Sequence, residues 1–243
     1  MPGFEKLAKH IDQASPAKIF IPLFLDLTSK SVVIFGGGKV GERKARLFSQ
    51  YSSVKVVSGA FTEGLLVLGQ NEICELVKAD LYQGFDRYIK GAFIVIPATN
   101  DAYLNLDIEK KAANLGIMVN KVDGVGDIIV PSIVRKDPIT IAISTENPGL
   151  TKYLRLKLEK DLTEDYQGMA KLLGQIRREL KEFVPLQKDR SKIVWEILQD
   201  AEVWRLLTES YEKAYMRARE HAMRDERDRL NAGYTSQSLH RRD

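Results

Sequence analysis

One short segment constrains the fold of this chain more than any other feature. An apolar, β-branched run at Ser31–Phe35 leads directly into the glycine-rich sequence Gly36–Gly41, and residues 39–50 then place apolar side chains among charges at helical spacing. A strand, a glycine-rich turn and a helix in this order are typical of the first unit of a doubly wound, nucleotide-binding sheet. The sequence therefore predicts an α/β fold built on a Rossmann-type parallel sheet.

The segments that follow agree with this prediction, because strand-like and helix-like patterns alternate as far as Asn120. Strands are predicted over residues 54–57, 73–77, 92–96 and 117–119, and helices over residues 39–50, 65–68 and 101–115. Strands separated by helices pair in parallel and are covered by helices on both faces. We expect residues 1–120 to form one Rossmann domain that binds NAD.

The pattern changes after Asn120. Two apolar strands, residues 128–134 and 139–144, are joined by the tight turn Arg135–Pro138, which predicts a β-hairpin. Helices are then predicted over residues 150–162, 166–183, 190–199 and 203–230. We divide this part into a hairpin with its helix at 121–162 and a helical C-terminal domain at 163–243 with a charged tail. A hairpin that is apolar at nearly every position cannot bury both faces alone, so we expect it to form the interface of a homodimer.

The charged tail allows two interpretations. Residues Lys213–Asp243 contain eight Lys or Arg and five Asp or Glu. A basic arm that binds a polyanion would carry one sign of charge, whereas mixed charges at helical spacing favour a solvated helix with paired charges.

The composition excludes several classes of protein. The single cysteine, Cys74, rules out an internal disulfide framework, and three histidines make a multi-histidine metal centre a poor prediction. The net charge of +4 does not demand a nucleic acid, and the apolar runs are too short to span a membrane. The polar start, Met1–Ala17, lacks the apolar core of a signal peptide. We therefore expect a cytoplasmic protein with no metal, no nucleic-acid partner and no membrane association.

The glycine-rich turn also predicts a ligand. Gly36 permits the tight turn, Gly38 lets the backbone approach a pyrophosphate, and Gly41 lets the helix pack close to the strand. The N-terminus of the helix offers free N–H groups to an anion. The predicted contacts of a bound dinucleotide in this turn are Gly36, Gly37, Gly38, Lys39, Val40 and Gly41.

Residues at the ends of the other strands complete the predicted cofactor site. The second strand ends in Ser58, Gly59 and Ala60, with no acid for the adenosine ribose and no arginine for a 2′-phosphate, so this feature does not choose between NAD and NADP. Thr99 and Asn100 follow the fourth strand, where they could border the nicotinamide ribose or cap the next helix.

The fifth strand ends in Asn120, which we include among the cofactor contacts, and Asp123 follows it in front of Gly124. A carboxylate at this edge can act as a general acid or base, although an Asp-Gly pair is also an ordinary turn.

Taken together, a set of segments resembles the precorrin-2 dehydrogenase family. The segments are Ile21–Phe24, Val33–Lys44, Ala98–Asp101, Val119–Asp123, Ile129–Val134, Pro138–Ser144 and Leu154–Glu159. Their order and spacing match over about residues 20–160, whereas Thr145–Asn147 replaces a longer glycine-rich stretch of the family and the C-terminal helices differ.

The resemblance implies NAD-dependent oxidation of precorrin-2 to sirohydrochlorin. It implies a catalytic role for the aspartate at position 123 and a dimer interface formed by the hairpin and the following helix. It also implies a tetrapyrrole cleft between the domains. Because precorrin-2 carries eight carboxylates, cations are expected near it, and Arg135 and Arg155 are the better candidates since arginine pairs carboxylates with two parallel hydrogen bonds. For each of these arginines, an ordinary surface charge is the alternative.

Two other functions stay open at this point. The enzyme could also insert Fe(II) into sirohydrochlorin as a ferrochelatase, for which Asp123 would have to remove the pyrrole protons. Alternatively, the chain could be a dinucleotide-sensing regulatory module, which would need a DNA-reading helix pair or a membrane segment.

Overall fold

The computed structural model describes residues 19–224, which fall into two compact units divided between Val130 and Pro131. We describe each unit by itself. The polar start Met1–Ala17, the end of the helix predicted over 203–230 and most of the charged tail lie outside the described residues.

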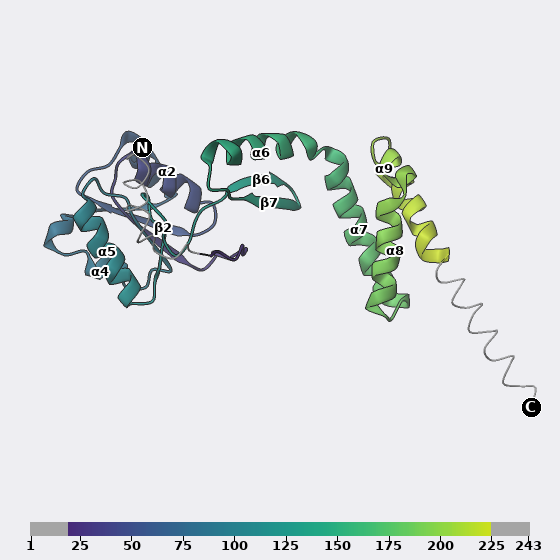
Figure 1. Cartoon of the computed structure of the whole chain (residues 1–243), viewed down its shortest axis with the longest axis horizontal. Helices are drawn as coiled ribbons and strands as arrows, with labels where there is room; N and C mark the ends of the chain where they lie inside the picture. The colour runs from purple at the N-terminus through teal and green to yellow at the C-terminus, as the bar shows by residue number, and fades with distance from the viewer. Residues whose placement is uncertain (1–18, 225–243) are drawn as a thin grey trace, which may run out of the picture. The chain divides into compact units, whose positions relative to one another are not determined.

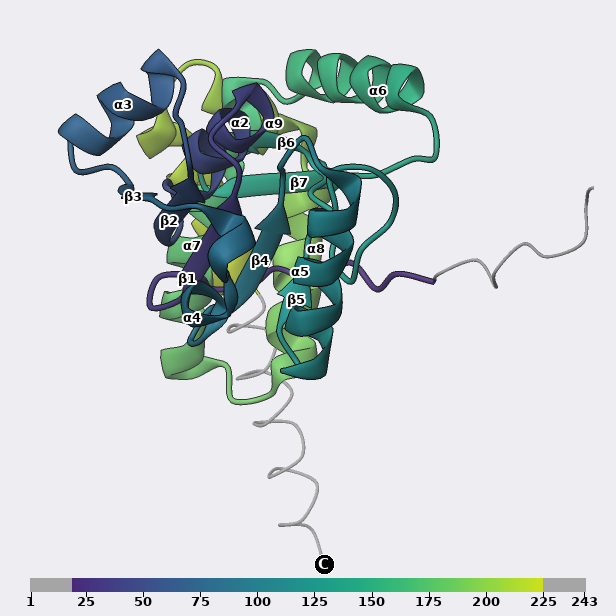
Figure 2. The same ribbon diagram turned by 90° about the vertical axis from the view of Figure 1, so that its left-hand side faces the viewer.

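The first unit is a five-stranded parallel sheet of the predicted Rossmann type (Figure 2). Its strands are β1 (Ser31–Phe35), β2 (Ser53–Ser58), β3 (Glu75–Lys78), β4 (Ile94–Pro97) and β5 (Met118–Val119). They lie in the order β3-β2-β1-β4-β5, and every neighbouring pair is parallel. The chain therefore leaves β1 at the centre of the sheet, where the strand order reverses and ligands bind in folds of this kind.

Helices cover both faces of this sheet because successive side chains of a strand point in opposite directions. Val32 and Ile34 of β1 pack on one face with the helices α2 (Lys39–Phe48) and α3 (Glu63–Gln70). On the other face, Val33 and Phe35 pack with α4 (Asp86–Ile89) and α5 (Ala102–Asn114).

Two short helical pieces were not predicted: the 3₁₀ turn η1 (Leu81–Gln83) and α4. Neither is long enough to show a helical period in the sequence. The Asp80 carboxylate accepts a hydrogen bond from the Tyr82 N–H at 3.0 Å and so caps η1, while burial of Leu81 and Ile89 holds both pieces on the sheet.

The first unit continues beyond the predicted boundary at residue 120. The Asp127 carboxylate accepts a hydrogen bond from the Val119 N–H at 3.1 Å, and Ile128 and Val130 pack against the sheet core. The predicted strand over 128–134 is therefore wrong in its first half: the first three residues belong to this packed segment, and the strand begins at Ser132, after Pro131.

The second unit opens with the predicted hairpin, formed by β6 (Ser132–Lys136) and β7 (Ile139–Ile143) in antiparallel pairing (Figure 1). The helix α6 (Pro148–Asp161) packs on it and begins where the Asn147 side chain accepts hydrogen bonds from the N–H groups of Gly149 and Leu150. The helices α7 (Glu164–Phe183), α8 (Gln187–Gln199) and α9 (Ala201–Leu207) and a further helical stretch at 211–224 share a second core.

The single helix predicted from residue 203 onward is wrong, because the chain breaks between α9 and the stretch at 211–224. Thr208 ends α9, and Ser210 starts the next stretch, with its carbonyl accepting from Ala214 N–H at 3.1 Å. Both Val203 and Ala218 then reach the same core. The gain in packing outweighs the continuous helix that the local pattern favours.

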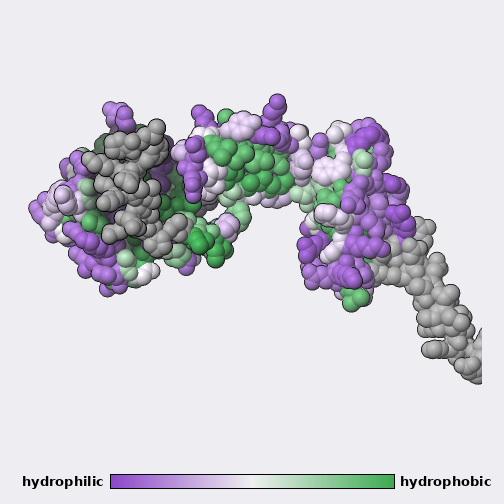
Figure 3. All heavy atoms as spheres, in the orientation of Figure 1, coloured by the Kyte–Doolittle hydropathy of each residue, from purple (hydrophilic) through white to green (hydrophobic). Residues whose placement is uncertain are grey.

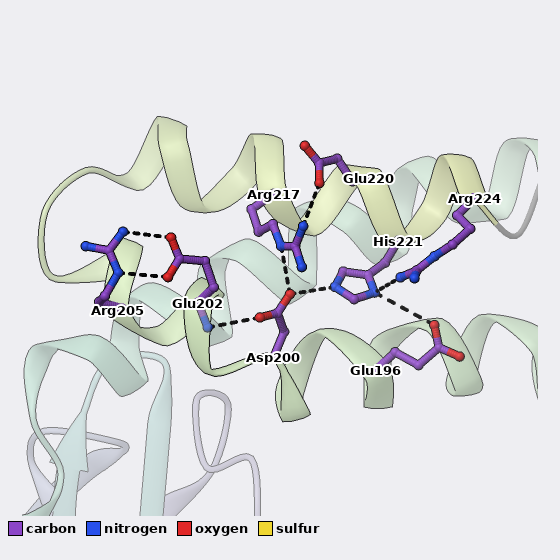
Figure 4. A network of polar contacts seen from close by, with 8 residues as sticks. All are labelled: Glu196, Asp200, Glu202, Arg205, Arg217, Glu220, His221 and Arg224. Atoms are coloured by element: carbon purple, nitrogen blue, oxygen red, sulfur yellow. Dashed lines mark hydrogen bonds and ion pairs between the residues drawn. The ribbon is translucent and has the colours of Figure 1, made fainter.

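A polar network joins the helices of this second unit (Figure 4). The Asp200 carboxylate, 12% exposed, lies 2.8 Å from both His221 Nε2 and Arg217 Nε. Arg224 lies 2.7 Å from Nδ1 of the same ring; because arginine only donates, Nδ1 accepts and Nε2 carries the proton donated to Asp200. Burial raises the pKa of Asp200, but hydrogen bonds from His221, the Glu202 N–H and Arg217 overcome this and hold the pKa below its ordinary value.

Candidate functional site

A cleft of about 890 Å³ lies in the first unit where the strands β1 to β4 end. Its size is that of a typical small-molecule site. The residues that line it are Gly36, Gly37, Gly38, Lys39, Val40, Ser58, Gly59, Lys78, Ala79, Asp80, Leu81, Tyr82, Ala98, Thr99, Asn100 and Leu104.

The turn after β1 requires glycine for steric reasons. Gly36 has φ +118°, and a Cβ on it would lie 2.2 Å from the Ala98 carbonyl oxygen. A Cβ on Gly37 would lie 2.0 Å from the Ala60 carbonyl oxygen, and one on Gly41 would lie 2.0 Å from the Gly36 carbonyl oxygen. The three glycines therefore allow β1, α2 and the neighbouring loops to approach each other closely.

Gly38 is different, since its backbone is extended and a Cβ on it would meet no atom of residues 19–224 within 4 Å. It is the N-cap of α2, and as a glycine it brings no side chain to accept a hydrogen bond from the first turn. The N–H groups at this helix start and the positive end of its dipole are thus left to an anion in the cleft. The space that a Cβ on Gly38 would occupy is open, so the pyrophosphate of a dinucleotide fits beside these N–H groups.

The loop after β4 lines the cleft as well. The Thr99 hydroxyl donates to the Asn105 side chain at 2.7 Å, and the Asn105 amide donates back to the Thr99 carbonyl at 3.1 Å. The N-cap of α5 is Asp101, which accepts from the N–H groups of Tyr103 and Leu104. The alternative that Thr99 or Asn100 caps this helix is therefore wrong, and both residues line the cleft.

Residues after β3 line the cleft as well, and the sequence reasoning missed them. Asp80 follows β3, and the Tyr82 hydroxyl donates to Asp101 Oδ2 at 2.6 Å. This hydrogen bond raises the pKa of Tyr82 and, with those from the N–H groups of Leu104 and Tyr103, lowers the pKa of Asp101. These residues directly follow a strand of the parallel sheet, and that position was the signal that could have identified them.

Three predicted cofactor residues lie outside the cleft lining. Gly41 packs closely against the Gly36 carbonyl, and the Ala60 carbonyl packs closely against Gly37. Asn120 is only 3% exposed: its amide donates to the Ile128 carbonyl at 3.0 Å, and its oxygen accepts from Lys44 Nζ at 2.7 Å. Burial, and to a smaller extent the neighbouring Arg43, lowers the pKa of Lys44.

Asp123 is exposed in the loop that follows β5 and does not line the cleft. The ends of this loop are fixed by the hydrogen bonds of Asn120 and Asp127, and the neighbouring Lys121 forms an ion pair with Glu109 at 2.6 Å. The carboxylate therefore projects from a loop with an anchored base.

The two predicted substrate arginines belong to the second unit. Arg135 is exposed on β6, and Arg155 on α6 pairs with Glu159 at 2.7 Å. Within residues 19–224, no group of three His, Cys, Asp or Glu side chains is placed to hold a metal ion, and no helix has the length and apolar character to cross a membrane.

A parallel sheet that reverses its strand order at β1, a glycine turn at that point and an uncapped helix N-terminus define a dinucleotide-binding domain. Residues 23–132 match a protein family described as putative NAD(P)-binding. The chain is 41% identical over 205 residues to the precorrin-2 dehydrogenase of Methanosarcina barkeri, an alignment that covers 82% of this chain and 92% of that relative. The chain belongs to the precorrin-2 dehydrogenase family.

Two further proteins are similar to this chain. The siroheme synthase of Zymomonas mobilis is 37% identical over 183 residues, which are 73% of this chain but 38% of that longer protein. A solved structure of SirC, a precorrin-2 dehydrogenase, has the same fold with a TM-score of 0.60 and 22% identity, covering 80% of this chain and all of that one.

Proposed function

We propose that this protein oxidises precorrin-2 to sirohydrochlorin with NAD as the hydride acceptor, a step of siroheme biosynthesis. The observation that carries the proposal is the open, uncapped start of α2 at Gly38, in a chain that is 41% identical to a precorrin-2 dehydrogenase. The reaction removes a hydride, which reduces the nicotinamide ring, and a proton, which passes to a base on the protein or in solvent.

The chain's own residues would hold the dinucleotide in a simple order. The N–H groups at the start of α2 bind the pyrophosphate beside Gly38, and the ends of β2 and β4 border the two nucleoside halves. Thr99 is held by Asn105, so this wall of the cleft is already fixed before a cofactor binds.

We assign the proton transfer to Asp123. The carboxylate stands on a loop whose base is anchored by Asn120 and Asp127, and family resemblance points to the same position. Arg135 and Arg155 are the proposed partners of the substrate carboxylates; Arg155 would exchange its exposed ion pair with Glu159 for a substrate group at small cost.

We further propose a homodimer formed through the hairpin and α6. Within the described part of the chain, α6 has no buried residue, and Leu150, Tyr153 and Leu156 expose apolar surface, Tyr153 to 62%. Figure 3 shows hydrophobic surface over the hairpin and α6. A second copy of the same chain would cover this surface.

The homodimer is tested by light scattering at micromolar concentration. Tyr153→Asp should yield a monomer, whereas Lys152→Asp, a change on the same helix that removes no apolar side chain, should leave the dimer intact. A wild-type monomer would contradict the proposed assembly. We also place the enzyme in the cytoplasm, which cell fractionation tests.

The activity is tested by anaerobic incubation of the purified protein with precorrin-2, with and without NAD. Formation of NADH only when protein, precorrin-2 and NAD are all present supports the proposed function. A protein that binds NAD but never reduces it in the presence of precorrin-2 would instead favour the regulatory module. Later addition of Fe(II) tests the ferrochelatase alternative, which predicts metal insertion above the spontaneous rate.

A further inference from the structure

The cleft extends beyond the glycine turn toward the edge of the sheet. Ser58 at the end of β2 pairs in register with Lys78 at the end of β3, and the Ala79 N–H donates to the Ser58 carbonyl at 3.0 Å. Neighbouring strands lie about 4.8 Å apart, so the end of β3 lies ~10 Å from the end of β1. A ligand anchored at Gly38 therefore meets β2 first and the segment after β3 next.

That segment presents an acid and an aromatic ring to the cleft. Asp80 is exposed, and its Oδ1 accepts a hydrogen bond from the Tyr82 N–H at 3.0 Å. Tyr82 is 74% exposed although it lines a concave site. An exposed large aromatic side chain beside a cleft has stacking surface that packing in the protein core does not use.

The ring of Tyr82 is also held in place. Its hydroxyl donates to Asp101 Oδ2 at 2.6 Å, while Asp101 Oδ1 accepts from two N–H groups of α5. Tyr82 thus connects the segment after β3 to the start of α5, and little side-chain entropy is left to lose when a planar ligand stacks on it.

We propose that Tyr82 and Asp80 form the adenine subsite of the bound dinucleotide. The base stacks on the Tyr82 ring, and the Asp80 carboxylate accepts a hydrogen bond from its 6-amino group. This assignment rests on the proposed use of a dinucleotide and adds the residues that select its base.

The chemistry of Asp80 makes the subsite selective. An ionised carboxylate only accepts hydrogen bonds, and the 6-amino group of adenine donates one. Hypoxanthine carries a 6-oxo group, which is an acceptor and would face the carboxylate unfavourably. Nicotinamide hypoxanthine dinucleotide therefore differs from NAD only in the base edge that Asp80 is proposed to read.

The decisive experiment measures the affinity of the full chain for NAD and for nicotinamide hypoxanthine dinucleotide by calorimetry. The wild type should prefer NAD by about 10- to 100-fold, the worth of one hydrogen bond to a charged group. Asp80→Asn can donate to the oxo group and still cap η1, so its preference should shrink to about threefold or reverse. Asp107→Asn, an exposed acid on α5 outside the cleft, should keep the wild-type preference.

A second measurement separates the base from the rest of the cofactor. Tyr82→Ala should weaken ADP-ribose by about 5- to 100-fold and leave nicotinamide mononucleotide unchanged, because only the former contains adenine. Tyr82→Phe keeps the ring and should bind ADP-ribose nearly as well as the wild type.

The outcomes distinguish this assignment from the proposed function. Tight NAD binding with equal affinity for the hypoxanthine dinucleotide, or an unchanged preference in Asp80→Asn, would overturn the adenine subsite and leave the dinucleotide function standing. Failure of the wild type to bind any dinucleotide would overturn both.

Discussion

The prediction that follows most directly from the site concerns Gly38. Its backbone is extended, with φ −81° and ψ −174°, and a Cβ there meets no atom of residues 19–224 within 4 Å. The fold should therefore accept a side chain at this position, whereas the proposed pyrophosphate site should not. Gly38→Val places three carbon atoms where the pyrophosphate must approach the N–H groups of α2.

Gly38→Val should change the stability of the fold little and the affinity for NAD strongly. A side chain at a compatible backbone position stabilises the fold by about 0.4–1 kcal/mol through the unfolded chain, and the weaker N-cap costs a similar amount. The free energy of unfolding should thus change by less than ~1 kcal/mol, which shifts Tm by a few degrees at most. Loss of about two charge-assisted hydrogen bonds to phosphate, each worth about 1.5–3 kcal/mol, should weaken NAD by roughly 100-fold or more.

The assay combines thermal unfolding with calorimetric titration of NAD. Gly174→Ala in α7 is the matched control, because among residues 19–224 a Cβ there makes only one contact, with Arg178 at 4.0 Å, and lies outside the cleft. It should raise Tm slightly and leave the affinity for NAD unchanged. A folded Gly38→Val protein that binds NAD as tightly as the wild type would refute the placement of the pyrophosphate at the start of α2.

Three further predictions use other parts of the molecule. Asp123→Asn should lower precorrin-2 turnover by about 10²- to 10⁴-fold with an unchanged Kd for NAD, and near-normal turnover would remove the catalytic role. Asp200→Asn should destabilise the protein by about 1–3 kcal/mol at neutral pH. Because hydrogen bonds lower the pKa of Asp200 in the fold, this stabilisation is present above about pH 4 and lost as pH falls through the folded-state pKa, so unfolding curves of wild type and variant should converge in acid. Burial lowers the pKa of Lys44, so the unfolded chain holds more protons at alkaline pH and wild-type stability rises with pH there; denaturant titrations of Lys44→Met should lack this rise.

Local patterns predicted the elements whose periodicity is strong. The strand at Ser31–Phe35 has the predicted bounds, and α5 begins and ends within one residue of its prediction. The boundaries that were predicted wrongly are set by tertiary packing, which local patterns do not show. The break after α9 exists because Val203 and Ala218 reach one core, and residues 121–130 stay with the sheet because Asp127 and Ile128 return to Val119.

The glycine turn could be predicted because its spacing reflects a steric requirement that shows in the sequence. Asp80 and Tyr82 could not be predicted in the same way. Tyr82 lies 19 positions before Asp101, and only the pairing of β3 beside β2 and of β4 beside β1 brings the two side chains together. Asn120 and Lys44 illustrate the same limit, since a polar residue after a strand can serve a buried hydrogen bond as well as a ligand.

The central claim, oxidation of precorrin-2 at the expense of NAD, is tested most directly by the stoichiometry of a single anaerobic reaction. NADH and sirohydrochlorin should be followed together by absorbance after precorrin-2 is added to the protein and NAD. The account predicts equal amounts of both products with the wild type and almost none with Gly38→Val. Sirohydrochlorin formed without NADH, or at the same rate with Gly38→Val, would contradict it.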